Sequence, residues 1–226
     1  KYKLCNMIFC LGDETKKRRE DNKTIWKQNK YFFFAFKFSM KINIQNIPFK
    51  TALVSCMKAY NIDFKESKTT LKTVLKMSDV KTHKITSIDQ NSGLFLKDMH
   101  LMLHFLNGVN HTIINCSLDD IVLVDNHYFF INPDKIIKLD GEIFTLEYPI
   151  QVDVFSPPEL HYMEELPQNL PLTTIYYNLA SILYYFLTHK IYKKISDLDF
   201  IYYSPLYYCL KRMLYINPQD RKFLYI

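Results

Sequence analysis

The chain has 226 residues, a formal net charge of +6 and a hydrophobic content of 48%. This composition fits one globular domain with a substantial core, and it excludes an intrinsically disordered or collagen-like chain. The five cysteines are odd in number and include no Cys-x-x-Cys pair, so neither a disulfide framework nor a zinc site is expected.

Composition also bounds the partners and the compartment. The longest apolar run, Ile175 to Thr188, is too short to cross a bilayer, so no membrane span is expected. Nucleic-acid binding is not expected either, because no basic stripe carries interleaved aromatic side chains. Four glycines among abundant Lys, Asn, Ile, Tyr and Phe indicate an AT-rich genome, such as that of a large virus or a parasite. Because the cysteines show no disulfide pattern, the reducing interior of a cell is expected, and the protein is expected to be intracellular, cytoplasmic or viral.

The first third of the chain predicts one strand and two helices. The aromatic run 31–38 is expected to be a strand, and it contains Lys37. Apolar residues at roughly helical spacing predict a helix over 48–61. A second helical stretch is expected from Ser67 to Met77, with Glu66 at its head, where an acidic side chain complements the helix dipole.

The centre of the chain carries an acidic turn followed by a predicted hairpin. Residues 113–123 read Ile-Ile-Asn-Cys-Ser-Leu-Asp-Asp-Ile-Val-Leu. The dipeptide Asp125-Asn126 is a common turn and separates two apolar strands. Asn132 follows the second strand directly, and Lys-Leu-Asp-Gly follows at 138–141.

The acidic turn resembles the catalytic loop of the protein kinase family, His-Arg-Asp-Leu-x-x-x-Asn followed by an apolar strand. The resemblance places Asp120 at the metal-binding Asn and Asn115 at the catalytic Asp. That Asp accepts the substrate hydroxyl proton in kinases. An amide cannot do so, because its nitrogen only donates and its oxygen is barely basic. The metal-binding Asp of the DFG motif is matched by Asn132 on ordinary loop lengths, or by Asp140 if a hairpin is inserted.

Three later segments resemble kinase motifs in the family's order. They are Phe-Ser-Pro-Pro-Glu-Leu at 155–160 for Ala-Pro-Glu, 176–188 for the central helix, and Leu-x-x-Asn-Pro-x-x-Arg at 214–221. The resemblance implies an ion pair between Glu159 and Arg221. It also implies one helix from Ile175 to Thr188, buried on nearly all faces. Because Ile175 stands where kinases carry the Asp that anchors the catalytic loop, a loop no longer held for chemistry is expected.

The segment before residue 80 is less similar to a kinase. Ala-Phe-Lys at 35–37 is similar to the strand that carries the nucleotide-binding lysine, which makes Lys37 the candidate; a solvated edge-strand lysine is an equal alternative. Only Glu66 stands where the partner of that lysine is expected. No glycine-rich loop precedes the strand, since Gly12 is the only glycine before Gly93. The resemblance therefore implies no bound cofactor, or weakly bound magnesium ATP with Asp120 as metal ligand.

Together the motifs imply an α+β, protein-kinase-like two-lobed fold, with a reduced N-lobe at 1–80 and a mostly helical C-lobe at 81–226. They imply a pseudokinase with no intact catalytic residue, which acts as a scaffold or interaction partner for a protein of unknown identity. A divergent serine/threonine kinase with residual ATP-dependent phosphoryl transfer is one alternative. An unrelated helical binding protein, in which the motif matches are chance, is the other.

Overall fold

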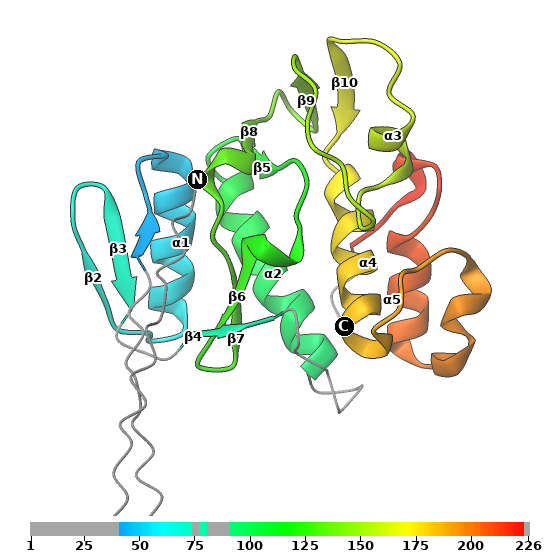
Figure 1. Cartoon of the computed structure of the whole chain (residues 1–226), viewed down its shortest axis with the longest axis horizontal. Helices are drawn as coiled ribbons and strands as arrows, with labels where there is room; N and C mark the ends of the chain where they lie inside the picture. Colours follow the sequence, from blue (N-terminus) through cyan, green and yellow to red (C-terminus); the bar gives the residue numbers. More distant parts are fainter. Residues whose placement is uncertain (1–40, 74–76, 81–90, 224–226) are drawn as a thin grey trace, which may run out of the picture. The chain divides into compact units, whose positions relative to one another are not determined.

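The computed structural model describes residues 41–73, 77–80 and 91–223 (Figure 1). All of them belong to one compact unit, Phe36–Ile226. The expected strand at 31–38 and its Lys37 lie outside the described residues. Helices and short strands are mixed along the chain, in agreement with the expected α+β class.

Helices carry most of the core and strands form small antiparallel sheets. The α-helices of the described residues are α1 (Ile47–Ala59), α2 (Asn91–Asn107), α3 (Pro158–His161), α4 (Thr174–Thr188) and α5 (Pro205–Met213). The strands are β1 (Lys41–Asn43), β2 (Phe64–Glu66), β3 (Thr70–Thr73), β4 (Met77–Asp79), β5 (His111–Ile113), β6 (Ile121–Val124), β7 (His127–Phe130), β8 (Ile136–Lys138), β9 (Ile143–Leu146) and β10 (Gln168–Pro171). Their hydrogen-bonded orders are β1-β3-β2, β4-β6-β7, β5-β8 and β9-β10.

The helix predicted over 48–61 is confirmed as α1. Its cap is Asn46, whose side-chain oxygen accepts a hydrogen bond from Phe49 N at 3.0 Å. Pro48 fits the first turn, where a backbone N–H has no helical partner in any case. The buried face of α1 packs against α2, and both helices share one core. α1 precedes residue 80 and α2 follows it, and the two helices pack together. A boundary between two lobes at residue 80 therefore stays a prediction.

The helix predicted from Ser67 to Met77 is wrong, because β2 and β3 form a hairpin there. Leu71 and Thr73 are buried while Lys72 between them is exposed, and this period of two belongs to a strand. The Ser67 hydroxyl holds the turn by accepting a hydrogen bond from Thr70 N at 3.1 Å. Glu66 therefore lies in a strand, and it forms an ion pair with Lys50 of α1.

The hairpin predicted across Asp125-Asn126 is confirmed by the pairing of β6 with β7. Both turn residues have positive φ, 50° and 63°, a conformation that Asp and Asn adopt more readily than most residues. At the open end of the hairpin, Ile131 N donates to the Asp120 carbonyl at 2.8 Å. The hairpin thus brings Asp120 and the neighbourhood of Asn132 side by side.

The helix predicted from Ile175 to Thr188 is confirmed as α4. Each of its side chains is buried or half-buried, as expected for a helix that is apolar all round. It lies between α2 and α5 and contacts both (Figure 1). Within the described residues, none of the helices combines the length and apolar character needed to cross a bilayer.

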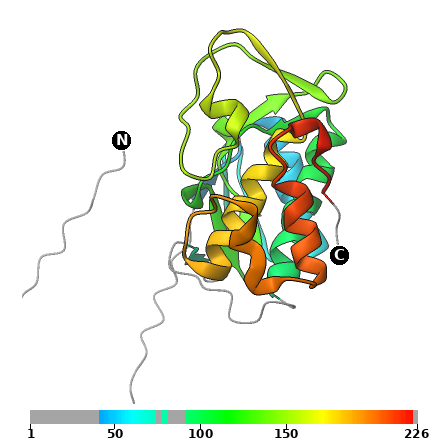
Figure 2. The same cartoon turned by 90° about the vertical axis from the view of Figure 1, so that its right-hand side faces the viewer.

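A second, smaller core lies beside the main one. Its buried members are Ile114, Leu139, Phe144, Leu146, Leu160 and Leu170. Ile114 directly follows β5, and the others come from the segments around β8, β9, α3 and β10, which Figure 2 shows at one end of α4. A surface groove opens over this small core and shares Ile114, Leu139 and Leu146 with it.

Candidate functional site

The carboxylate of Asp120 is the centre of a buried polar cluster. Its Oδ2 accepts hydrogen bonds from the Ser117 backbone N and hydroxyl, both at 2.7 Å, and from Lys135 Nζ at 2.6 Å. Its Oδ1 accepts from Asn132 Nδ2 at 2.6 Å. The side chain of Asp120 is 6% exposed and that of Lys135 27%. Both carboxylate oxygens are therefore committed to partners within the chain.

The surroundings keep Asp120 ionised. Burial raises the pKa of this carboxyl, but the hydrogen bonds from Lys135, Asn132 and Ser117 outweigh burial, and the net pKa lies below its ordinary value of 3.8. A depressed pKa means that the folded state binds the proton less tightly than the unfolded state. The resulting stabilisation is complete above about pH 4 and is lost as the pH falls through the folded-state pKa.

The structure brings together two of the residues expected at the metal-binding positions. Asn132, rather than Asp140, is hydrogen bonded to Asp120. The oxygen of Asn132 accepts a bond from Asp134 N at 3.1 Å, which caps the short 3-10 turn Pro133–Lys135. No group of three or more His, Cys, Asp or Glu in the described part of the chain is arranged to hold a metal ion.

Sequence reasoning missed Lys135. The available signal was the dipeptide Asn-Pro at 132–133, because an Asn cap followed by Pro predicts a tight turn. One such turn brings a residue three positions past the cap back towards the cap. It places the ammonium group of Lys135 against the carboxylate that Asn132 also contacts.

Asn115, expected at the catalytic position, is buried and only 2% exposed. Its Nδ2 donates to the Ser156 hydroxyl at 2.9 Å and to the Gln151 carbonyl at 3.3 Å. Its Oδ1 is buried without a partner among the described residues. Ser156 Oγ in turn accepts from Asp153 N at 2.8 Å. Asn115 therefore ties the loop to the segment 151–156.

The expectation that the loop is no longer held is wrong, because Asn178 of α4 anchors it. Cys116 N donates to Asn178 Oδ1 at 2.8 Å. Asn178 Nδ2 donates to the carbonyls of Cys116 and Phe155, at 2.9 and 3.1 Å. Ile175 packs in the core, and the anchor lies three residues later, about one helical turn. The signal was a lone Asn in an apolar helix, since buried amides are nearly always paired.

The ion pair expected between Glu159 and Arg221 is present and bidentate. Arg221 Nη1 donates to Glu159 Oε1 at 2.5 Å, and Nη2 donates to Oε2 at 2.8 Å. The Arg221 side chain is fully buried, and its other donors reach the carbonyls of Tyr215 and Ile216 at 2.7 and 2.9 Å. The guanidinium group also lies 5.0 Å from the ring centre of Tyr177. The pair fixes α3 and the C-terminal segment to each other.

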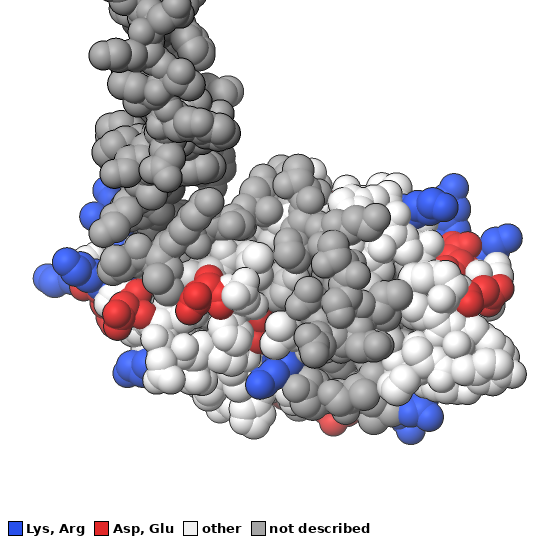
Figure 3. Space-filling model, turned by 90° about the horizontal axis from the view of Figure 1, so that it is seen from below, with Lys and Arg blue, Asp and Glu red and all other residues white. Residues whose placement is uncertain are grey.

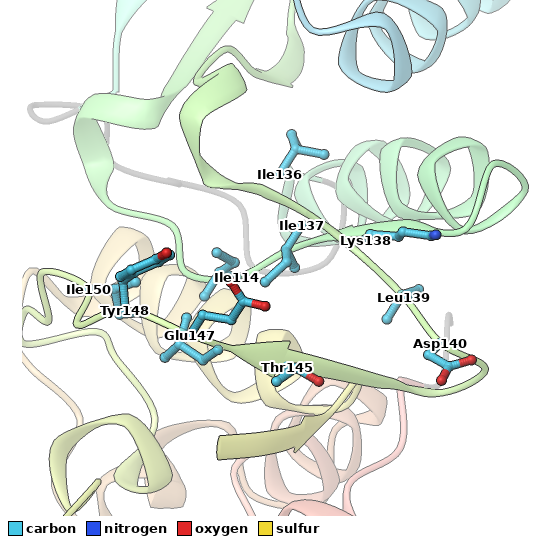
Figure 4. A pocket seen from close by; sticks show the side chains of 11 residues that line it. Ile114, Ile136, Ile137, Lys138, Leu139, Asp140, Thr145, Glu147, Tyr148 and Ile150 are labelled. Atoms are coloured by element: carbon cyan, nitrogen blue, oxygen red, sulfur yellow. The ribbon is translucent and has the colours of Figure 1, made fainter. Parts of the chain in front are cut away.

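A groove of about 690 Å³ opens over the small core (Figure 4). One wall is Ile136–Asp140, the other is Thr145–Tyr148, and Ile114 and Ile150 also line the groove. Ile114 directly precedes Asn115, and its apolar side chain lines this surface.

Surface charge is mixed on the face seen in Figure 3. Lys and Arg side chains of the described residues lie among Asp and Glu side chains there, and much of the described surface is uncharged. This face therefore presents no large patch of one sign.

No protein-family model matches the chain, and no curated protein matches it either. The chain's own residues supply a carboxylate neutralised by a lysine, a loop anchored to α4, and a groove lined by Ile114.

Asn178→Ala tests the loop anchor. The change leaves the buried Cys116 N–H and two carbonyls without their amide partner, at a cost of about 1–3 kcal/mol for each buried group left unpaired. Thr174→Val is the control in the same helix, because the Thr174 hydroxyl is buried without a partner among the described residues. Urea denaturation should show a large loss for the first variant and nearly none for the second. Equal midpoints would contradict the anchor.

Glu159→Ala and Arg221→Ala test the buried ion pair. Each leaves a buried charge without its partner and should lower the free energy of unfolding by about 3–5 kcal/mol. In a double-mutant cycle the double variant should lose clearly less than the sum. The half-exposed pair of Lys50 and Glu66 is the control. Glu66→Ala should cost at most about 1 kcal/mol, and a similar cost at both pairs would refute the assignment.

Proposed function

We propose that the chain is a protein-kinase-like module that does not transfer phosphate and acts as a scaffold or interaction partner. The observation that carries the proposal is the contact of Lys135 and Asn132 with the carboxylate of Asp120. The four motif resemblances, which follow one another in the order of the kinase family, support the fold. The elements that carry the motifs follow one another in a compatible order. This order is α2, the loop that contains Asp120, the β6–β7 hairpin, Glu159 of α3, α4 and Arg221.

A magnesium ion would have to compete with a fixed ammonium group. In kinases the loop Asn and the DFG Asp hold the metal ions that bridge the ATP phosphates. Here the amide and the carboxylate stand in exchanged positions and bind each other, and the carboxylate accepts four hydrogen bonds. Hard cations bind through carboxylate oxygens, and Lys135 already neutralises the charge of this one. The cluster therefore favours a structural role over metal binding.

Proton transfer lacks its base at the expected position. Asn115 is an amide, and its nitrogen is bonded to Ser156 and Gln151 of the same chain. Its burial also separates it from any hydroxyl that a substrate would present at the surface. Loss of one group from a catalytic set usually costs several orders of magnitude in rate, and the losses need not add for activity to vanish.

An interaction role is supported by apolar side chains that the described surface exposes. Tyr148, Tyr162, Tyr203 and Ile216 are 74%, 81%, 76% and 80% exposed. Aromatic side chains are enriched at protein–protein interfaces, where they supply contact area at low entropic cost. Single exposed residues are ordinary, so the groove beside Tyr148 is the stronger indication of a binding surface.

The function is tested by a kinase assay on generic protein substrates and by titration with magnesium ATP during thermal unfolding. We expect no phosphate transfer and no dose-dependent rise in Tm. A ligand that binds the folded state and not the unfolded state raises the Tm, so a rise would show nucleotide binding. An active protein kinase in the same assays is the positive control. Transfer by this chain that disappears in Asp120→Ala would show that the carboxylate serves catalysis and would overturn the proposal.

A further inference from the structure

We propose that the groove between β8 and β9 binds an extended segment of a partner protein, which adds its backbone to the open edges of these strands. The inference depends on the proposed scaffold function only for its biological role, and it names the kind of partner. Its geometry comes from residues other than those bonded to Asp120.

The groove lies where a hairpin opens. β8 and β9 follow each other around Gly141, and one bridge closes the turn, with Asp140 N donating to the Ile143 carbonyl at 2.8 Å and Ile143 N to the Asp140 carbonyl at 3.2 Å. Beyond the bridge β8 pairs with β5, and β9 pairs with β10. If the hairpin continued, Leu139 would next face Phe144 and Lys138 would then face Thr145, but Lys138 and Thr145 line opposite walls of the groove (Figure 4).

Both walls present backbone groups to the groove. Leu139 N donates to the Asn110 carbonyl at 2.8 Å, so Leu139 faces β5, and its neighbour Lys138 must face the other way. Leu172 N donates to the Glu142 carbonyl at 2.7 Å, so Glu142 faces β10, and Thr145 and Glu147 face the groove by the same alternation. Backbone groups that face outward from a strand edge are a template for another strand.

The space suits a short stretch of extended chain with aliphatic side chains. The groove volume of about 690 Å³ is in the range of sites that bind a drug-sized ligand. Ile137 projects into it from the β8 wall, and Ile114 lies at its base (Figure 4). An added strand rises about 3.3 Å per residue, so the three residues of β8 can align with about three to five residues of a partner. Every second side chain of that strand would point at the apolar base.

Charge selects for a basic residue in the partner. Lys138 and Asp140 carry opposite charges at the turn end of the groove, which leaves Glu147 unmatched at the other end. Figure 4 shows the Glu147 side chain reaching into the groove. The expected occupant is therefore an extended peptide with alternating aliphatic residues and a Lys or Arg placed near Glu147.

The test is selection of a display library of random twelve-residue peptides on the full chain. Enriched peptides should carry alternating aliphatic residues and at least one Lys or Arg. Glu147→Lys should weaken their binding about tenfold or more, as expected when a like charge replaces an opposite one. Glu164→Lys is the matched control, since Glu164 is exposed, does not line the groove and changes the net charge equally. No enrichment, or equal loss in both variants, would overturn the proposal.

Backbone pairing is tested with the strongest selected peptide and a copy that is N-methylated at alternate residues. The methylated copy lacks the donors that strand addition needs and should bind at least about tenfold more weakly. Equal binding would refute strand addition. A dimer of the chain that Glu147→Lys dissolves would reassign the groove to self-association. Phosphate transfer would overturn the proposed function, but the outcome of these peptide measurements does not depend on it.

Discussion

The buried ion pair of Asp120 and Lys135 is the interaction on which the candidate site depends. A carboxylate that is only 6% exposed is costly to ionise unless partners compensate for the lost water. Lys135, Asn132 and Ser117 supply that compensation. Ser117 precedes the hairpin, and Asn132 and Lys135 belong to the turn that follows it. The carboxylate thus joins both ends of the β6–β7 hairpin, and its negative charge is neutralised by the chain itself.

Two further polar contacts attach this region to the helical core. Asn178 joins the loop and the Phe155 carbonyl to α4, and Glu159 joins α3 to Arg221. Both use side chains whose donors and acceptors are matched, which is the condition for burial of polar groups. The segment from β8 to β10 has its own small core, so β8 and β9 can separate beyond one bridge while each pairs with another strand. This arrangement gives the chain a groove with strand edges on both walls.

Local sequence patterns predicted an element correctly where apolar patterning or the preference of the turn residues is strong. The spacing of apolar residues placed α1, the resemblance to the kinase central helix placed α4, and the turn dipeptide placed the β6–β7 hairpin. The helix predicted over 67–77 is wrong for two reasons. Leu71 and Thr73 are buried at strand spacing, and a side-chain hydrogen bond from Thr70 N to Ser67 stabilises the turn of a hairpin. Lys135 and Asn178 were missed for another reason, since their partners are set by tertiary folding. The motif resemblances gave the pairing of Glu159 with Arg221 in advance, whereas for Asp120 and Asn132 they gave the positions and the structure shows the contact.

The most direct test of the account is a ¹³C NMR titration of the Asp120 carboxyl in the full chain. If Lys135 neutralises it, its pKa lies below the ordinary value, and Lys135→Met raises that pKa because the charged donor is removed. Addition of millimolar Mg²⁺ to the natural chain then leaves the Asp120 signal unchanged. An Asp120 that titrates at or above its ordinary pKa, or whose signal follows Mg²⁺, would contradict the structural role assigned to this carboxylate.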